Sequence, residues 1–416
     1  MSLSRRKFLS LSGAAMATAA AGRITQACEP VPDPADLASA INAFAADLYG
    51  KLRTEKGNLF FSPASISTAL TMTAGGARGN TLAEMNAVLH LPENPHLLFS
   101  RFLGRVFAHG QDIKRPYELT AANSVWAHTG YPWHADFKTL ISKNYLAAVV
   151  DTDFGKPEEA RAAINKWVEK ETRDRIKDLI PGGVITPLTR MVLANAVYFK
   201  GDWASPFKEK DTKDAPFHLD GGERVPVPLM HQLGDFAYGE VEYDRESRAG
   251  DSMQIVSLPY AGNDLSMVLM LPKRRNLAAL EGKLTAANLS AWTKELRPQK
   301  VRVFVPRFKL EPKESLRLNE PLQALGMKDA FDDKKADFRG MHTAKDVLYI
   351  TAVMHKAFVD VNEKGTEAAA ATGVVVGLRG AARETEFRAD KPFLFLIREN
   401  KTGTILFLGR LANPKS

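Results

Sequence analysis

The sequence predicts one mixed α+β domain, with helices early in the chain and strands dominant late, behind an N-terminal targeting segment. Apolar residues recur at helical spacing between residues 37 and 52. Short runs at 192–198 and 266–271, which are apolar except for Asn195 and Ser266, are typical of strands that are covered on both faces. No internal repeat or low-complexity block divides the remaining chain, so we expect a single domain over 37–416.

Length and composition are those of an ordinary globular protein. The chain has 416 residues, of which 45% are apolar and 25% charged, and this excludes collagen-like, disordered and polytopic membrane proteins. The net charge is +8, but four basic residues lie before Cys28. Without them, 52 basic residues face 48 acidic ones, and this mild excess predicts no nucleic-acid partner. Cys28 is the one cysteine, so an intramolecular disulfide is excluded.

Residues 1–27 have the layout of an export signal. Basic residues at 5–7 precede Phe8-Leu9 and an alanine-rich apolar run that ends at Ala21. This run is too short and too weakly apolar for a stable membrane span. The paired arginines favour a twin-arginine signal, which carries folded cargo across a bacterial membrane, and an ordinary secretion signal is the alternative. In both cases we expect the mature protein in the periplasm, at the cell surface or outside the cell.

The signal has two expected cleavage points, after Ala21 and after Ala27. Cys28 follows the second of these, so lipid attachment stays open, although Thr25 stands where such signals prefer leucine. A membrane is therefore an expected partner only if Cys28 is lipidated. The proline-rich residues 28–36 are predicted to form a linker.

The elements of the domain follow from local patterns of apolar, capping and turn residues. In chain order we expect a helix over 37–52, a strand over 58–62 that ends at Pro63, a buried helix over 64–74, a helix from Asn80-Thr81, buried strands over 192–198 and 266–271, an alternating strand over 301–310, and two strands over 393–397 and 405–408 joined by a turn at 400–403.

No motif of a known catalytic site is present. The chain contains no G-x-S-x-G, H-E-x-x-H, Walker A or G-x-G-x-x-G pattern. The glycine-rich stretch 75–79 lacks the lysine of a phosphate-binding loop, and 151–155 begins like a calcium loop but has its glycine one position early. The histidines show no paired ligand spacing. We therefore expect no metal and no cofactor, and we favour binding or inhibition over an enzyme.

The segment 363–380 (EKGTEAAAATGVVVGLRG) carries conflicting local preferences. Its alanine-rich half favours a helix, whereas the threonine, glycines and valines that follow oppose one. Every second residue from Thr366 to Val376 is small or β-branched, and none is charged. Such a face can enter a sheet without forcing its core apart. We predict a segment that is exposed at one time and a buried strand at another.

The length of this segment fits that prediction. Extended, it spans roughly 50 Å, while a compact chain of this size is roughly 55 Å wide. Inserted as one strand, the segment would run nearly the length of the molecule. Arg379 would lie on an exposed tip, where an arginine fits proteases with an acidic specificity pocket.

Four motifs resemble the serpin family and stand in the family's order. They are 58–67 (NLFFSPASIS), 195–203 (NAVYFKGDW), 361–372 (VNEKGTEAAAAT) and 387–395 (FRADKPFLF). The resemblance covers essentially the whole mature chain and, together with the signal, points to an exported prokaryotic member. It implies the serpin fold, with about nine helices around three β-sheets, a five-stranded central sheet A and an exposed reactive-centre loop.

The resemblance also implies roles for individual residues. Counting forward from Glu363 and back from Phe387 places the reactive bond between Arg379 and Gly380. The hinge of the loop comprises Glu363, Lys364, Gly365, Thr366, Glu367, Ala368, Ala369, Ala370, Ala371 and Thr372. The shutter, which controls opening of the central sheet, comprises Ser62, Ser65, Asn195 and His355. The breach, where the loop first enters, comprises Trp203, Arg307 and Glu363, with Arg307 paired to Glu363.

The function implied is that of an irreversible suicide-substrate inhibitor of a trypsin-like serine protease, not an enzyme. Cleavage after Arg379 would let the loop insert into sheet A and trap the acyl-enzyme covalently. A non-inhibitory serpin that acts as a binding protein and is cleaved without trapping is the alternative, and the four alanines at 368–371 of the hinge favour inhibition. Gly377 and Gly380 depart from the family pattern and leave the cleavage register slightly open. We expect a monomer, and the basic residues around 101–115 are too sparse to predict a polyanion cofactor.

Overall fold

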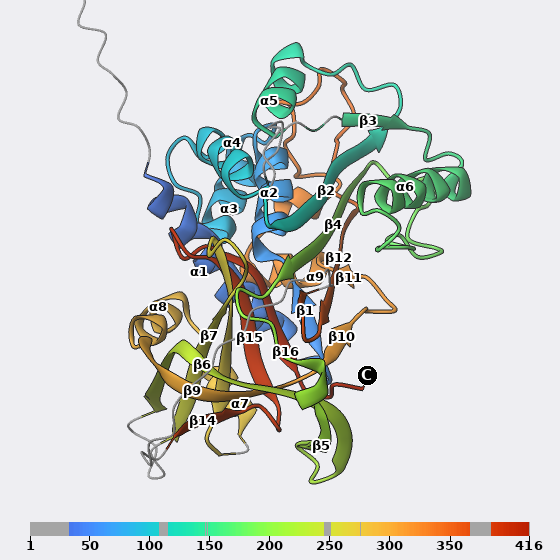
Figure 1. Cartoon of the computed structure of the whole chain (residues 1–416). Helices are drawn as coiled ribbons and strands as arrows, with labels where there is room; N and C mark the ends of the chain where they lie inside the picture. The colour runs from blue at the N-terminus through green and yellow to red at the C-terminus, as the bar shows by residue number, and fades with distance from the viewer. Residues whose placement is uncertain are drawn as a thin grey trace, which may run out of the picture. The chain divides into compact units, whose positions relative to one another are not determined.

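The computed structural model describes residues 33–107, 115–145, 147, 149–244, 251–274, 276–366 and 384–415. The predicted export signal, Cys28 and residues 367–383 lie outside the described residues. Within the described part, helices dominate early and strands late (Figure 1), which confirms the α+β class.

The described residues form nine α-helices and two short 3₁₀ helices. They are α1 (Pro34–Leu52), α2 (Pro63–Ala74), α3 (Gly79–Leu89), α4 (Pro95–Val106), α5 (Ala135–Tyr145), α6 (Pro157–Glu171), η1 (Glu209–Asp211), α7 (Leu277–Gly282), α8 (Ala286–Lys294), α9 (Asn319–Leu325) and η2 (Asp329–Phe331).

Helix α1 begins at Pro34, inside the stretch 28–36 that the sequence assigned to a linker. The carboxylate of Asp33 accepts a hydrogen bond from the N–H of Ala35, which satisfies one free donor of the first turn. Proline suits this turn because its ring presets φ and its missing N–H has no partner there anyway. The linker is therefore shorter than predicted at its C-terminal end.

The strands of the described residues are β1 (Leu59–Phe61), β2 (Tyr117–His128), β3 (Val149–Thr152), β4 (Met191–Asp202), β5 (Lys213–His218), β6 (Arg224–Asp244), β7 (Asp251–Pro259), β8 (Leu265–Pro272), β9 (Arg297–Pro306), β10 (Phe308–Leu310), β11 (Leu316–Arg317), β12 (Ala352–Val361), β13 (Gly365–Thr366), β14 (Thr385–Arg388), β15 (Phe393–Glu399) and β16 (Ile405–Leu411).

A seven-stranded sheet positions the functional residues. Its order is β10-β12-β13-β4-β2-β3, and the short β11 also pairs with β12. Because β10 and β11 share one edge position and β13 is two residues long, the sheet has five main positions, as expected for sheet A. β4 pairs antiparallel with β2 and parallel with β12, so β4 and β12 are direct neighbours along most of their length.

The remaining strands form one nine-stranded sheet, in the order β1-β16-β15-β8-β7-β6-β9-β14 with β5 beside β6. The long strand β6 pairs with β5 near its start, with β9 in its middle and with β7 at its end. This continuous pairing connects strands that the family resemblance divides between two sheets. The pattern over 301–310 is also divided: β9 ends at Pro306, and β10 belongs to the other sheet.

Both faces of the seven-stranded sheet are covered. Helix α6 packs on β2 and β4 from one side (Figure 1), where Ile164 and Val168 are buried with Tyr198. Helix α2 and strands of the nine-stranded sheet cover the other side, where Val197 and Phe199 are buried. Residues 191–199 are therefore all buried, as the pattern of this strand, apolar except for Asn195, predicted.

Candidate functional site

Two hinge residues lie inside the seven-stranded sheet. In β13, Thr366 is opposite Gly201 on β4 and opposite Val361 on β12, antiparallel to both. The side chain of Thr366 is fully buried, and its hydroxyl shares a 2.9 Å hydrogen bond with that of Tyr260. A glycine is required at 365, because a Cβ there would lie 2.1 Å from the carbonyl oxygen of Gly201. The hinge thus starts an additional strand between β4 and β12.

The buried carboxylate of Glu363 anchors the chain just before this point. It forms an ion pair with Arg307, and the hydroxyl of Thr212 donates to its Oε1 at 2.6 Å. Burial opposes ionisation of Glu363, but these two hydrogen bonds, a backbone hydrogen bond and the charge of Arg307 together outweigh it and hold the pKa of Glu363 below its usual range. The Arg307–Glu363 pair that the resemblance implied is present in the structure.

Trp203 holds the same turn from the other side. Its indole N–H donates to the carbonyl of Asn362 at 2.9 Å, and its ring stacks on Tyr260 with 4.7 Å between centroids. Its backbone N–H donates to the carbonyl of Lys364 at 2.8 Å. The three predicted breach residues therefore surround the turn through which the chain enters the sheet.

The four predicted shutter residues form one hydrogen-bonded cluster in the middle of the β4–β12 pairing. His355 on β12 lies opposite Asn195 on β4, and its Nδ1 is hydrogen-bonded to Asn195 Oδ1. The amide of Asn195 donates to Ser65 Oγ at 2.7 Å, and the backbone N–H of Ser62 donates to His355 Nε2 at 3.0 Å. The cluster ties the two strands to each other and to the start of α2.

This arrangement determines the protonation of His355. The N–H of Ser62 points at Nε2, so this nitrogen must be unprotonated, and the ring proton lies on Nδ1, which donates to Asn195. The side chain is fully buried, and desolvation lowers the pKa of His355 to about 3. His355 is therefore neutral throughout the physiological pH range.

The family described as serpin (serine protease inhibitor) matches residues 39–414. The chain belongs to the serpin family. An uncharacterised serpin-like protein of Thermococcus kodakarensis is 42% identical to this serpin, over 91% of this chain and 85% of its own length. The leukocyte elastase inhibitor of Bos taurus is 42% identical, over 91% of this chain and 99% of its own.

Solved structures agree with the family assignment. Serpin48 of the insect Tenebrio molitor, described as a highly specific serpin, is 31% identical to this serpin and matches it with a TM-score of 0.79. The match covers 91% of this chain and 98% of the insect protein. The resemblance of the four motifs and the serpin fold are thus confirmed.

The buried His355 predicts a pH dependence of folding. Because its pKa is 6.5 when unperturbed and about 3 in the fold, the unfolded chain binds a proton between these values that the folded serpin does not. The contribution of neutral His355 to the free energy of unfolding is therefore fully present above pH 6.5. Below pH 6.5 the free energy of unfolding falls by up to about 1.4 kcal/mol per pH unit. Urea unfolding from pH 7.5 to 5 measures this slope. His355→Gln should reduce this slope, but not abolish it, because burial also lowers the pKa of His96 and of His342. His90→Gln, at an exposed histidine, should leave the slope unchanged, and equal slopes in all three proteins would refute the assignment.

Asn123 on β2 belongs to the same cluster but was not among the predicted residues. Its Oδ1 accepts hydrogen bonds from the amide of Asn195 and, at 3.1 Å, from the hydroxyl of Ser65. The cluster therefore extends across three strands of the sheet. The sequence contains one signal for the role of Asn123, because a polar amide stands there within a stretch of mostly small and apolar residues. This signal does not identify Ser65 and Asn195 as its hydrogen-bond partners.

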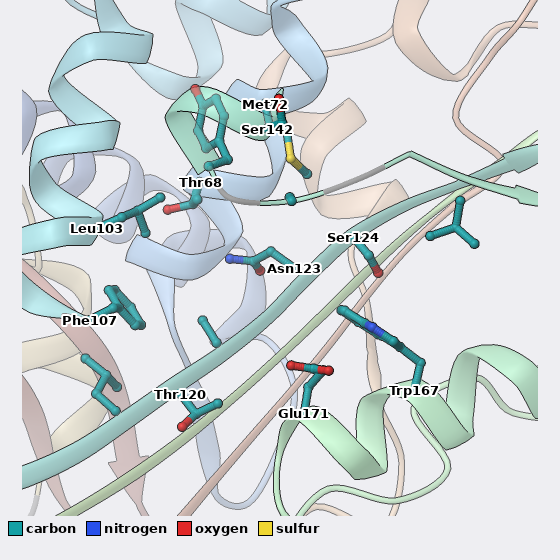
Figure 2. Close-up of a pocket in the computed structure, with 15 residues that line it drawn as sticks. Thr68, Met72, Leu103, Phe107, Thr120, Asn123, Ser124, Ser142, Trp167 and Glu171 are labelled. Carbon is teal, nitrogen blue, oxygen red and sulfur yellow. The ribbon is translucent and has the colours of Figure 1, made fainter. Parts of the chain in front are cut away.

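A cavity of about 640 Å³ lies beside this part of β2 (Figure 2). Thr120, Asn123 and Ser124 of β2 line it, with side chains from α2, α4, α5 and α6. An unfilled volume has no packing contacts to break, so β2 can shift here at lower cost than within a filled core. The part of β2 that carries Asn123 therefore borders unfilled volume.

The other predicted site residues lie outside the described residues. These are the reactive-bond residues Arg379 and Gly380 and the hinge residues 367–372. Within the described ranges, no three His, Cys, Asp or Glu side chains lie together in a way that could hold a metal ion. Across the same ranges, no helix has the length and apolar character needed to cross a membrane.

Proposed function

We propose that this serpin is a single-use, irreversible inhibitor of a trypsin-like serine protease, which cleaves it between Arg379 and Gly380. The observation that carries the proposal is the position of Gly365 and Thr366, which start an additional strand between β4 and β12. A loop that continues from Thr366 would extend β13 between β4 and β12, and so would enter the sheet as a new strand.

The pairing registers support that path. If the antiparallel pairing continues from Thr366, residue 372 falls opposite Asn195 on β4 and opposite His355 on β12. These two residues already face each other. Insertion therefore requires β4 and β12 to separate but not to slide. Residues directly opposite point to the same face of a sheet, so the Thr372 hydroxyl would enter the shutter in place of the Asn195–His355 hydrogen bond.

The composition of the loop fits the face on which it would be buried. The Thr366 side chain points into the core, and alternate residues of a strand share one face. Ala368, Ala370, Thr372, Val374 and Val376 would follow it on that face, and none carries a charge. Burial of the two valines and new backbone hydrogen bonds would stabilise the inserted form.

The chemistry is that of an interrupted proteolysis. The protease's serine oxygen attacks the Arg379 carbonyl carbon and forms an ester, while the bond to the Gly380 nitrogen breaks and the protease's histidine protonates the leaving amine. Cleavage frees the loop at one end, and insertion carries the ester to the other end of the sheet. Hydrolysis of the ester then stalls, because the attached protease is distorted. The serpin itself catalyses nothing.

Incubation with trypsin, followed by a denaturing gel and mass spectrometry of the released peptide, tests this function. We expect a band at the summed mass of serpin and protease and a peptide that begins at Gly380. An elastase belongs in the same experiment, because the Bos taurus relative carries the name leukocyte elastase inhibitor. Clean cleavage without the band, by both enzymes, would instead support the non-inhibitory alternative.

The place of action is a further part of the proposal. Residues 1–27 support export, by the twin-arginine or the general route, to the periplasm, the cell surface or the medium. There the serpin would act as a monomer, attached to a membrane only if Cys28 is lipidated. Sequencing of the mature N-terminus distinguishes cleavage after Ala21 from cleavage after Ala27.

A further inference from the structure

Two exposed apolar side chains lie where β4 and β12 begin, at the opposite end of the sheet from β13. Leu188, three residues before β4, is 72% exposed, and Val347, in the segment before β12, is 37% exposed. Among the described residues they are two of four large apolar side chains with such exposure, with Leu97 and Leu233. Apolar side chains that gather at one place on a surface commonly mark a contact with another molecule.

The backbone holds Leu188 in this exposed position. The N–H of Thr189 donates to the carbonyl of Thr186 at 2.9 Å, and the N–H of Thr186 donates to Thr189 Oγ1 at 2.9 Å. The hydroxyl of Tyr349 donates to the Leu188 carbonyl at 3.3 Å, which connects the two segments. Leu188 and Val347 thus belong to one braced surface, which we call the Leu188 patch and which also includes Tyr349.

A strand that continued from β13 in the same register would end beside the Leu188 patch. Continued antiparallel from Thr366, position 379 falls opposite Leu188 on the β4 side and opposite Leu348 on the β12 side. Position 380 falls opposite Val347. The thirteen steps from Thr366 to Arg379 extend over roughly 43 Å. The chain outside the described residues therefore has the length to bring Arg379 to the patch.

We propose that the Leu188 patch is a contact surface for the serine protease while it is esterified to Arg379. This inference rests on the proposed function. Gly380 has left at that stage, and the protease's serine oxygen is bonded to the Arg379 carbonyl carbon, between Leu188 and Val347. The protease surface around its catalytic serine must then lie within a side-chain length of both residues.

Apolar contact at this place prolongs the trapped state. The contact removes apolar surface from water only while the protease is pressed against the end of the sheet, so it stabilises the distorted arrangement over the relaxed one. In the relaxed arrangement water adds to the Arg379 carbonyl carbon, the serine oxygen leaves as the alcohol, and free protease and an Arg379 carboxylate remain. The patch therefore determines the lifetime of the complex and not its formation.

The test compares complexes of trypsin with wild-type serpin, the Leu188→Ser/Val347→Ser double variant and Leu97→Ser, a control at an exposed leucine of α4. Each covalent complex is purified, and the return of protease activity is followed with a chromogenic substrate. We expect equal yields of complex, and release from the double variant faster by about tenfold or more. If the double variant fails to fold, the single variant Leu188→Ala carries the test, because a side chain exposed to this degree contributes little to stability.

The outcomes separate the inference from the proposed function. If the wild type forms no covalent complex with any serine protease tried, the proposed function fails. If the wild type forms the complex and the variants release protease at the wild-type rate, only the role of the patch is refuted. A lower yield with an unchanged lifetime also refutes it, because the residues would then act before trapping. So does a wild-type dimer that becomes a monomer in the variant, since a second copy would then cover the patch.

Discussion

Replacement of Arg379 by alanine is expected to abolish inhibition of trypsin. The guanidinium group of Arg379 can make charge-assisted, bidentate hydrogen bonds with a carboxylate in an acidic specificity pocket. A pocket that is built to bind such a group rejects a residue without it by about 10⁴-fold. We expect the second-order rate constant for trypsin inactivation to fall by about this factor, as measured from progress curves.

Two further variants make this result specific to the reactive bond. Arg379→Lys keeps the positive charge and should retain most of the inhibition of trypsin. Arg388→Ala, at an arginine beyond the loop, should behave as the wild type does. If Arg379→Ala inhibits trypsin as fast as the wild type, the assignment of the reactive bond is wrong, and sequencing of the cleaved loop would locate the true one.

Thr366→Arg is expected to convert the inhibitor into a substrate. The Thr366 side chain is fully buried beside Tyr260, on the face that the inserted strand would turn to the core. An arginine there would bury an unpaired charge, at a cost of several kcal/mol. Because Thr366 already occupies this place in the described structure, the arginine would expel β13 from the sheet and remove the start from which insertion proceeds. Insertion then becomes slower than hydrolysis of the ester. Titration of trypsin should require at least about tenfold more serpin per protease, with cleaved serpin in place of the covalent band on a gel.

The matched control for this substitution is Thr366→Ser, which keeps the hydroxyl that bonds to Tyr260 and should trap trypsin normally. Both variants should be cleaved after Arg379, because the hinge lies away from the reactive bond. Undiminished trapping by Thr366→Arg would mean that loop insertion does not drive inhibition in this serpin.

Local sequence patterns predicted part of the framework of the site, namely β4 and α2, but neither β2, which carries Asn123, nor β12, which carries His355. The run at 192–198, which is apolar except for Asn195, is buried on both faces, because α6 covers one side of β4 and α2 the other. The pattern over 301–310 was misleading. Alternation reports that one face of a strand is buried but not which sheet the strand joins, and the chain changes sheets after Pro306.

The candidate site could be predicted in part. The residues of the shutter and the breach followed from resemblance, and the structure brings Ser62, Asn195 and His355 into one cluster. Asn123 was missed because its partners lie 58 and 72 residues away in the chain. Such a contact depends on which strands become neighbours, and no local pattern of residues records that.

The sequence by itself determined the uncharged face of the loop, the arginine at its tip and the family. These properties are local, since they depend on residue type at successive positions. Only the tertiary structure decided that β4 and β12 pair in a register that admits a strand without sliding, and that this register leads from Thr366 to Leu188. Register is set when strands distant in the chain meet and bury their apolar faces together, so it arises from packing and not from the order of residues.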